Sequence, residues 1–447
     1  MILTVAKQSL LHRKVSVLLT FLALLVSVSL LVSIEHIRKE AKNSFYRTVS
    51  GVDLIVGART GQINLLLSSV FRVGANANSV SWQSYQRIIS NPQVDWAIPL
   101  SLGDSHKGFA VIGTTNDYFE HYRYGDKRQL RFQAGGRFTN SGVNVGVNEH
   151  TQVAFVSNHF DVVLGAEAAK QLNYQVGDQI IISHGVGKVS FSHHGEHPFT
   201  VVGILQFTGT PVDQGVHVGL NAIESIHAQP KTSLSKNNRS QTSLRTSKQA
   251  EDHNHDEHDE HDEYELAQPT QVSAFMLGLK SRIAVLQVQR QVNQDKLEPL
   301  SAIIPGVALG ELWRLVGAVE NILRIISAAV LIASLLGLST MLLASLRERK
   351  AEISVFRIMG AKPSFVFWLL QLEALSIALG ASVMAVVLVT GIIFLSNDWL
   401  LAEYGLSLSV NILSIHTLWV IAAVLIATFV IALIPSIGAY RNARALS

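Results

Sequence analysis

The sequence predicts an α-helical membrane protein with four transmembrane helices and a large α+β domain between the first two of them. Residues 15–34 carry no charged side chain, a long and mostly polar interval follows, and three further apolar stretches lie in the last quarter of the chain. Because about 20 helical residues cross the hydrocarbon core of a bilayer, each of the four stretches is long enough to span it. The polar interval is long enough for two subdomains, a membrane-proximal α/β part and a mainly β part.

The first apolar stretch could be a cleaved signal peptide or a membrane anchor, because Arg13 and Lys14 precede it as basic residues precede the apolar core of a signal peptide. The apolar core of a signal peptide has about 7–15 residues and ends at a small-residue cleavage site, whereas this stretch is longer. We therefore expect an uncleaved anchor. The third stretch is long enough to tilt or to hold a break near Gly380. The predicted spans are residues 15–34, 325–345, 365–395 and 418–434, with an amphipathic cytoplasmic helix at 1–14 and a cytoplasmic tail at 435–447.

The distribution of Lys and Arg predicts the orientation of the chain, because cytoplasmic loops hold the excess of these residues. Basic residues cluster before the first span, between the second and the third, and after the fourth, whereas residues 396–417 contain no Lys or Arg. Arg38 and Lys39, just after the first span, are a weak signal against this orientation. We expect both termini in the cytoplasm and residues 35–320 on the opposite side of the membrane.

The amino-acid composition and the net charge limit the kinds of molecule that the chain is expected to bind. Hydrophobic residues make up 48% of the chain, the mean hydropathy is +0.29 and the net charge is only +3. These values suit a membrane protein and give no indication of a nucleic-acid partner. The chain has no cysteine, so the external domain must be stabilised by its own core without disulfides.

The external region is expected to begin with a helix that continues out of the first span, because residues 35–44 contain neither Gly nor Pro. Alternating apolar residues then predict short strands, most densely in a mainly β subdomain at about 115–227. Residues 228–266 are almost devoid of apolar side chains and are expected to be disordered. The approach to the second span, residues 309–323, is expected to be helical again.

The predicted disordered segment ends in a tract of histidines and carboxylates. Four imidazoles alternate with eight carboxylates in residues 251–263, and neutral imidazole is the usual protein ligand for zinc and other transition metals. No spacing in the tract fixes a tetrahedral site, so a metal-collecting or metal-sensing loop and a merely solvated acidic linker both remain open. The candidate ligands are His253, His255, His258 and His261, and more weakly His193, His194 and His197 of an earlier loop.

The external region contains no Gly-x-Ser-x-Gly or His-Glu-x-x-His motif, and its other histidines, such as His217, are scattered singly. An enzyme is therefore not predicted. Two ionisable residues lie near or inside the spans, where charged groups are rare and invite a functional explanation. For Glu373 a structural and a functional role remain open, whereas Arg324 is expected to reach the outer membrane interface.

Residues 347–363, RERKAEISVFRIMGAKP, form a short amphipathic segment between the second and third spans. Ile353, Phe356 and Met359 recur at helical spacing, Gly360 is suited to end a helix, and Pro363 prevents its simple continuation. On this pattern alone, a helix on the membrane surface that satisfies the positive-inside rule remains an alternative to a docking element.

This segment resembles the loop of ABC transporter permeases of the MacB/FtsX/LolC type, in which a basic run is followed by Glu-Ile and Arg-x-Leu/Met-Gly-Ala. Residues 10–14, 162–170, 199–205, 373–375 and 434–446 are also similar to that family, so the resemblance covers nearly the whole chain except about 228–266. It implies four spans, a large periplasmic domain, and a coupling helix at 347–363 that docks on a separate ATPase subunit. The residues that the resemblance assigns to this coupling are Arg349, Glu352, Ile353, Phe356, Arg357, Met359, Gly360 and Ala361.

The resemblance implies a bacterial inner-membrane permease that transmits movement from an ATPase to its periplasmic domain. No Gly-x4-Gly-Lys-Ser/Thr loop occurs, so ATP is expected on the partner subunit only and no cofactor is required apart from possible Zn²⁺ on the histidine tract. The expected partners are the ATPase, a second copy of the chain, a periplasmic protein and membrane lipid. Two alternatives remain, an FtsX-like regulator of a periplasmic hydrolase and a LolC-like permease that extracts lipoproteins or lipids.

Overall fold

The structure is a computed structural model that describes residues 14–74, 78–139, 142–145, 152–155, 160–184, 198–227, 268–348, 363–404, 409 and 411–445. The chain divides into two compact units. One comprises Met1–Val49 and Gly306–Ser447 and is called the bundle unit below; the other comprises Ser50–Pro305 and is called the external unit.

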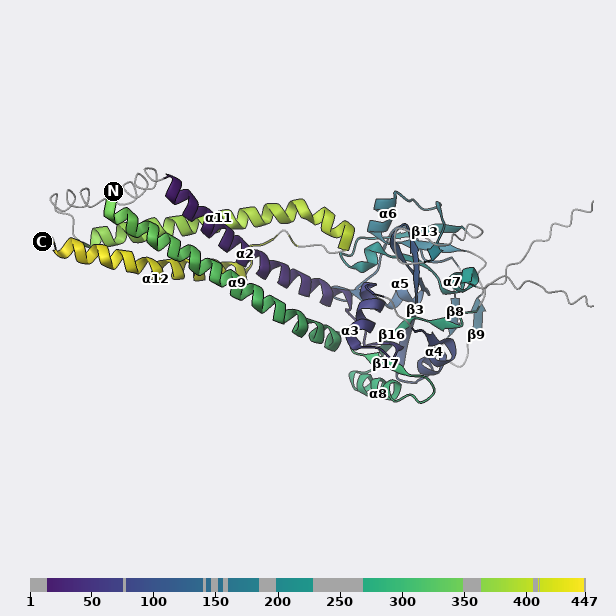
Figure 1. The fold of residues 1–447 in the computed structure, drawn as a ribbon. Coiled ribbons are helices and arrows are strands. Elements are labelled where there is room, and N and C mark those ends of the chain that lie inside the picture. The colour runs from purple at the N-terminus through teal and green to yellow at the C-terminus, as the bar shows by residue number, and fades with distance from the viewer. Residues whose placement is uncertain are drawn as a thin grey trace, which may run out of the picture. The chain divides into compact units, whose positions relative to one another are not determined.

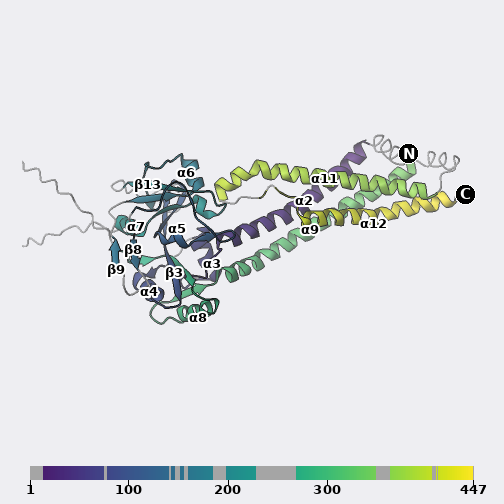
Figure 2. The same ribbon diagram turned by 180° about the vertical axis from the view of Figure 1, so that it is seen from behind.

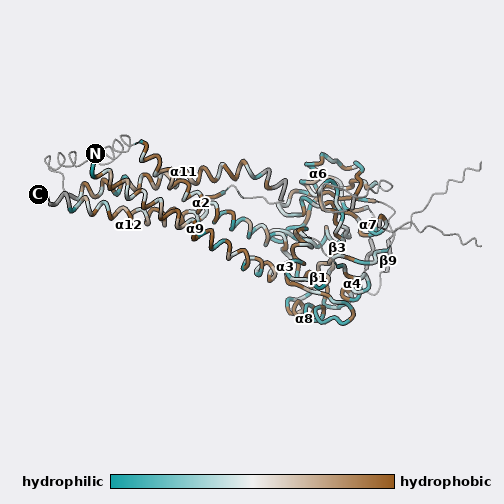
Figure 3. The backbone as a smooth tube through the Cα atoms, in the orientation of Figure 1, coloured by the Kyte–Doolittle hydropathy of each residue, from teal (hydrophilic) through white to brown (hydrophobic). Residues whose placement is uncertain are grey.

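The bundle unit is built from four long helices, each long and apolar enough to cross a membrane. Figure 1 shows them running side by side, and Figure 3 shows that hydrophobic residues dominate along them. With a mixed α/β unit between the first and the second, they confirm the predicted fold class. The helices are α2 (Lys14–Thr48), α9 (Pro305–Glu348), α11 (Pro363–Tyr404) and α12 (Ile415–Ala445).

Helix α11 is the centre of the bundle, because it packs closely against both α2 and α12. Small residues on its buried face let the neighbouring backbones approach, as is usual where lipid supplies no hydrophobic driving force between helices. The helix is continuous through Gly380, where an added Cβ would lie 3.5 Å from the ring of Phe21 on α2. The sequence left open whether the helix breaks near Gly380, and the structure shows no break there. The fully buried small residues are Ala374, Ala378, Ala381, Ser382 and Ala385.

The external unit is organised around one eleven-stranded sheet. Its main path runs β11-β13-β10-β14-β4-β3-β16-β1-β17, with β12 paired to β3 and β7 paired to β13. The pairs β10–β13 and β14–β4 are parallel, and the other pairs are antiparallel. The strands are β1 (Leu54–Ala58), β3 (Val94–His106), β4 (Phe109–Thr114), β7 (Phe132–Gly135), β10 (Asp161–Leu164), β11 (Gln179–Ile180), β12 (Ser183–His184), β13 (Phe199–Leu205), β14 (Val216–Gly219), β16 (Ala274–Leu279) and β17 (Leu300–Ile303).

Two hydrophobic cores lie against this sheet. Helices α4 (Trp82–Ile89) and α8 (Arg282–Asn293) bury their apolar faces against β1, β16 and β17 in one of them. Helices α6 (Ala166–Leu172) and α7 (Leu220–His227) do the same against β4, β10, β13 and β14 in the other. The view from behind in Figure 2 shows these helices on the sheet. Both cores therefore share one sheet, which passes from the first to the second through β3 and β4.

The smaller elements complete the external unit. Helix α3 (Gln62–Leu66) continues into the π-helix η1 (Leu67–Phe71), α5 (Asp117–His121) follows β4, and a 3-10 turn spans Pro211–Gln214. Three two-stranded sheets are formed by β2 (Val80–Ser81) with β15 (Gln271–Val272), β5 (Arg123–Tyr124) with β6 (Arg128–Gln129), and β8 (Gly142–Val145) with β9 (Gln152–Phe155).

Local sequence signals set several of these boundaries. Ser81 caps α4 by accepting a hydrogen bond from the backbone of Ser84, and Ser281 caps α8 in the same way.

The pattern around residues 183–198 predicts a hairpin, and β11 does pair with β13. However, Ser183 and His184, separated from β11 by two residues, form β12, which pairs with β3 instead of extending the hairpin.

The first and last strands of the external unit are hydrogen-bonded neighbours. β1 pairs with β17 in antiparallel register, with Ile55 opposite Ile303 and Gly57 opposite Ser301. Helix α2 ends at Thr48, six residues before β1 begins, and α9 begins at Pro305, two residues after β17 ends. The chain therefore passes from α2 into the sheet, and from the sheet into α9, through two adjacent strands.

Candidate functional site

The predicted coupling segment lies almost wholly outside the described residues. Helix α9 is described up to Glu348 and α11 from Pro363, which leaves all eight coupling residues predicted between 349 and 361 outside. Their assignment stays a prediction. The two helices that flank the segment are described, and both belong to the bundle unit.

The predicted metal ligands of the histidine tract, His253, His255, His258 and His261, also lie outside the described residues. The segment that carries them leaves α7 and returns at β15, so both of its ends are anchored in the external unit. The weaker candidates lie outside as well: His193, His194 and His197.

Helices α2 and α9 contact one another through a series of side-chain pairs. The hydroxyls of Ser27 and Ser334 are 2.8 Å apart and buried, and Ser334 also donates to the backbone oxygen of Ala23. Further along, the rings of Phe45 and Trp313 meet edge to face with centroids 5.6 Å apart. The two residue numbers add to 361 in the first pair and to 358 in the second, which is the nearly constant sum expected of one antiparallel register. Ser27 and Phe45 are about 27 Å apart along α2 at 1.5 Å per residue.

Between these two pairs lies an alternating network of four charges. The carboxylate of Glu35 accepts hydrogen bonds from Arg38 at 3.0 Å and from Arg324 at 2.9 Å. Arg38 also pairs with Glu320 at 3.6 Å. The side chains are partly exposed, so a single pair would contribute only about 0.2–1 kcal/mol, and the linking of four charges makes the arrangement geometrically specific. Arg324, expected at an interface, thus has a defined partner on the first helix.

Two further polar contacts fix the other helices of the bundle. His36 is buried, and its Nε2 donates to the backbone oxygen of Ser409, in the connection between α11 and α12, at 2.8 Å. In α11, Gln371 is fully buried and donates to the backbone oxygen of Phe429 on α12 at 3.3 Å. Such contacts across helices are the usual use of polar side chains in membrane bundles.

Glu373 is fully buried inside the bundle unit, two residues along α11 from Gln371. An interfacial side chain that reaches the water would remain partly exposed, so the burial argues against that explanation. A buried carboxyl group in a membrane span is a candidate for function.

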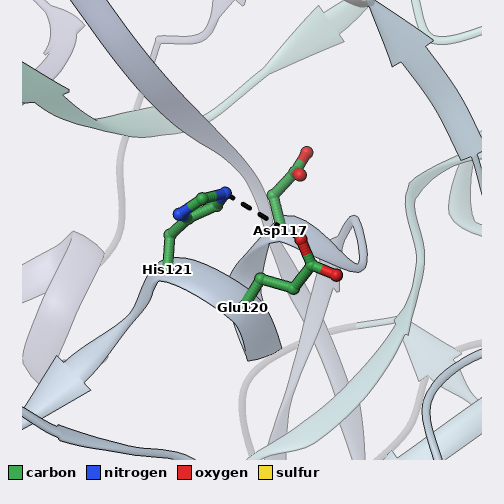
Figure 4. Close-up of side chains that lie close together, drawn as sticks. All are labelled: Asp117, Glu120 and His121. Carbon is green, nitrogen blue, oxygen red and sulfur yellow. Dashed lines mark ion pairs between the residues drawn. The ribbon is translucent and has the colours of Figure 1, made fainter.

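A compact group of potential metal ligands occurs in the external unit. Asp117, Glu120 and His121 project from the short helix α5, and their donor atoms all lie within 4.8 Å of one another. Figure 4 shows the three side chains and the His121–Glu120 ion pair at 4.0 Å. Sequence analysis missed this group, although the spacing i, i+3, i+4 in residues 117–121 places all three on one helical face.

His217, which the sequence left open as an ordinary surface or core histidine, is a core histidine in the structure. It is fully buried, its ring lies tilted by 38° against that of Tyr118 with centroids 4.9 Å apart, and its Nδ1 contacts the backbone oxygen of Val163 at 3.3 Å. Burial, with the nearby charge of Arg72, lowers the pKa of His217 to about 3. The ring is therefore neutral at physiological pH and serves packing.

Comparison with known proteins identifies the class to which these features belong. The family model of the MacB-like periplasmic core domain matches residues 17–294, more than half of the chain. The model of the FtsX-like permease C-terminal domain matches residues 324–443. The chain is a multi-pass membrane protein that belongs to the MacB/FtsX-type family of ABC transporter permeases.

Solved structures also resemble the chain. The periplasmic region of MacB from Actinobacillus actinomycetemcomitans is 9% identical, with a TM-score of 0.33, over 60% of this chain and 97% of that one. The extracellular domain of the noncanonic ABC-type transporter YknZ from Gram-positive bacteria is 12% identical, with a TM-score of 0.30, over 56% and 98%. No curated protein matches the sequence. The family assignment rests on the two family models.

The register of α2 and α9 is open to a direct chemical test, because the chain contains no cysteine. We expect the double variant Ser27→Cys/Ser334→Cys to form an intramolecular disulfide under mild oxidation, since the native hydroxyls are 2.8 Å apart. The measurement is the shift in electrophoretic mobility before and after reduction. The matched control is Ser27→Cys/Ser327→Cys, which moves one thiol about 10 Å along α9. Equal cross-linking of the two variants would show that the register is wrong.

Proposed function

We propose that this chain is the permease subunit of an ABC transporter in which a separate ATPase acts on residues 347–363 and the helices α2 and α9 transmit the movement to the external unit. The observation that carries the proposal is the continuity of these two helices. α2 has 35 residues and α9 has 44, each without a break, and the side-chain pairs described above connect them.

The lengths of the helices suit the transmission of force. At 1.5 Å per residue, α9 is about 66 Å long, whereas the hydrocarbon core of a bilayer is about 30 Å thick. Both helices lead into adjacent strands of the same sheet, so a displacement of either one acts on the β1–β17 pair. A stiff helix pair that ends on a hydrogen-bonded strand pair is the mechanical element that this function needs.

An apolar face on α9 supports the proposal that two copies assemble. Leu315, Val319, Ile322 and Ile326 are each at least half exposed and follow one another at spacings of four, three and four residues. This alternation is the heptad pattern of a helix that packs against another helix. The first three residues precede the predicted span at 325–345, and a second α9 is the partner that the pattern fits.

The location follows from the same proposal. Both termini lie in the cytoplasm, the external unit lies in the periplasm, and the membrane is the bacterial inner membrane. The positive-inside distribution supports this orientation. Arg38, one of the two residues that argued against it, is paired with Glu35 and Glu320, so its charge is balanced within the bundle unit.

The histidine tract makes transition-metal handling the most specific form of the proposal. Its composition favours zinc or a similar metal, and its two ends are anchored on α7 and β15 of the external unit. Metal bound there would act on the unit that α2 and α9 move. A regulator of a periplasmic hydrolase and a permease that extracts lipoproteins or lipids use the same mechanical element, and would be distinguished by the periplasmic partner that copurifies.

The coupling assignment predicts the effect of a charge reversal. We expect Glu352→Lys to abolish the stimulation of ATP hydrolysis by this chain in the assembled complex, because it places a like charge in a basic segment at the proposed docking surface. The external unit should unfold at an unchanged temperature. ATP turnover in lipid is the measurement, and Asp126→Lys, an exposed site in the β5–β6 turn, is the control. Normal stimulation by the Glu352→Lys chain would contradict the assignment.

The role of the tract is tested by removing it. If the tract senses metal, ATP turnover of the complex should change when zinc is added, and deletion of residues 251–263 should abolish the change. Deletion of residues 235–247 is the matched control, because it removes the same length of the same segment without any histidine. A zinc response that survives the first deletion excludes the tract as the sensor.

A further inference from the structure

We propose that Asp117, Glu120 and His121 form a zinc-binding site in the folded part of the external unit, separate from the histidine tract. The proposal does not depend on coupling to an ATPase, and it concerns residues that sequence analysis did not single out. It rests on the donor set, on the way in which neighbouring residues hold the imidazole, and on the charge that the two carboxylates bring together.

The donor set fits a transition metal. One imidazole and two carboxylates supply three protein ligands, the number found in zinc sites that keep one position for water. The donor atoms lie within 4.8 Å of one another, whereas ligands around a tetrahedral zinc at about 2.0–2.1 Å would be about 3.3 Å apart. Side-chain rotations therefore suffice to close the site. Glu120 and His121 are 45% and 35% exposed in their side chains, so an ion can reach them.

The imidazole is held in place by an aromatic stack. The ring of His121 lies parallel to that of Trp96 on β3, with an interplanar angle of 8° and centroids 5.5 Å apart. Trp96 is itself fixed, because it lies against Gly278 of β16, where an added Cβ would come within 2.1 Å of the indole. Tyr118 and Phe119 of α5 are buried and anchor the helix that carries all three ligands. The ligands thus stand on a rigid support, which a selective metal site needs.

The electrostatics favour a cation at this place. Asp117 accepts a hydrogen bond from the Thr115 hydroxyl at 3.0 Å, and a carboxylate oxygen of Glu120 lies within 4.8 Å of one of its own. Arg137 pairs with Glu120, so a zinc ion would have to displace or share this contact. A divalent ion would neutralise both carboxylates at once. The imidazole makes zinc a better candidate than calcium or magnesium, which bind oxygen ligands.

The experiment measures zinc binding by the full chain in detergent. In every sample the seven other candidate histidines, at positions 193, 194, 197, 253, 255, 258 and 261, are replaced by Asn, so that their binding does not mask the site. We expect isothermal titration to show one zinc per chain, and cobalt(II) to give the visible absorption of a four-coordinate site. Glu120→Gln and His121→Asn should each weaken binding at least tenfold, while the nearby Asp126→Asn should leave it unchanged. Absence of zinc binding, or equal binding by all variants, would overturn the proposal.

A second measurement separates loss of the site from loss of the fold. Without metal, Asp117→Asn should unfold cooperatively like the parent, because the asparagine amide oxygen can still accept the hydrogen bond from Thr115. With zinc, the unfolding temperature should rise in the parent and stay constant in Asp117→Asn. An equal rise in both chains would overturn the proposal.

Discussion

The pairing of the two helices that begin and end the external unit is the constraint on which the rest of the molecule depends. The chain leaves the bundle through α2 and returns through α9, and these helices contact each other through Ser27–Ser334, the Glu35 charge network and Phe45–Trp313. The strands that follow and precede them, β1 and β17, are hydrogen-bonded to each other. The two connections of the external unit are thus held together in the bundle and again in the sheet.

The contacts between α2 and α9 differ in kind along the helices, because each suits its local surroundings. The buried Ser27–Ser334 contact joins the two helices through a hydrogen bond between hydroxyls within an apolar bundle. The charged residues lie where the side chains are partly exposed, and the pairing of Arg38 there explains why a basic residue is tolerated just after the first span. The aromatic pair lies further along the same register. A helix pair that is connected at intervals along its length resists splaying better than one held at a single point.

The four helices and most strands of the external unit were predictable, because apolar length and alternation are local properties of the sequence. Residues 199–205, in which apolar side chains alternate, form β13, and the helix expected beyond residue 34 continues to Thr48. The pairing of Arg324 with Glu35 was not predictable, since it joins residues 289 positions apart. The Asp117–Glu120–His121 group was visible as a helical spacing, but its support by Trp96 depends on a sheet contact with Gly278 that no local pattern encodes.

The central claim, that stiff helices carry movement to the external unit, is tested most directly by a distance measured between two copies of the chain. A spin label at Lys296→Cys, an exposed position in this cysteine-free chain, reports the separation of the external units in the complex with the ATPase. The account predicts that ATP changes this distance, and that replacing residues 41–43, 316 and 318 by glycine abolishes the change while ATP is still hydrolysed. An unaltered change in the glycine variant would contradict it.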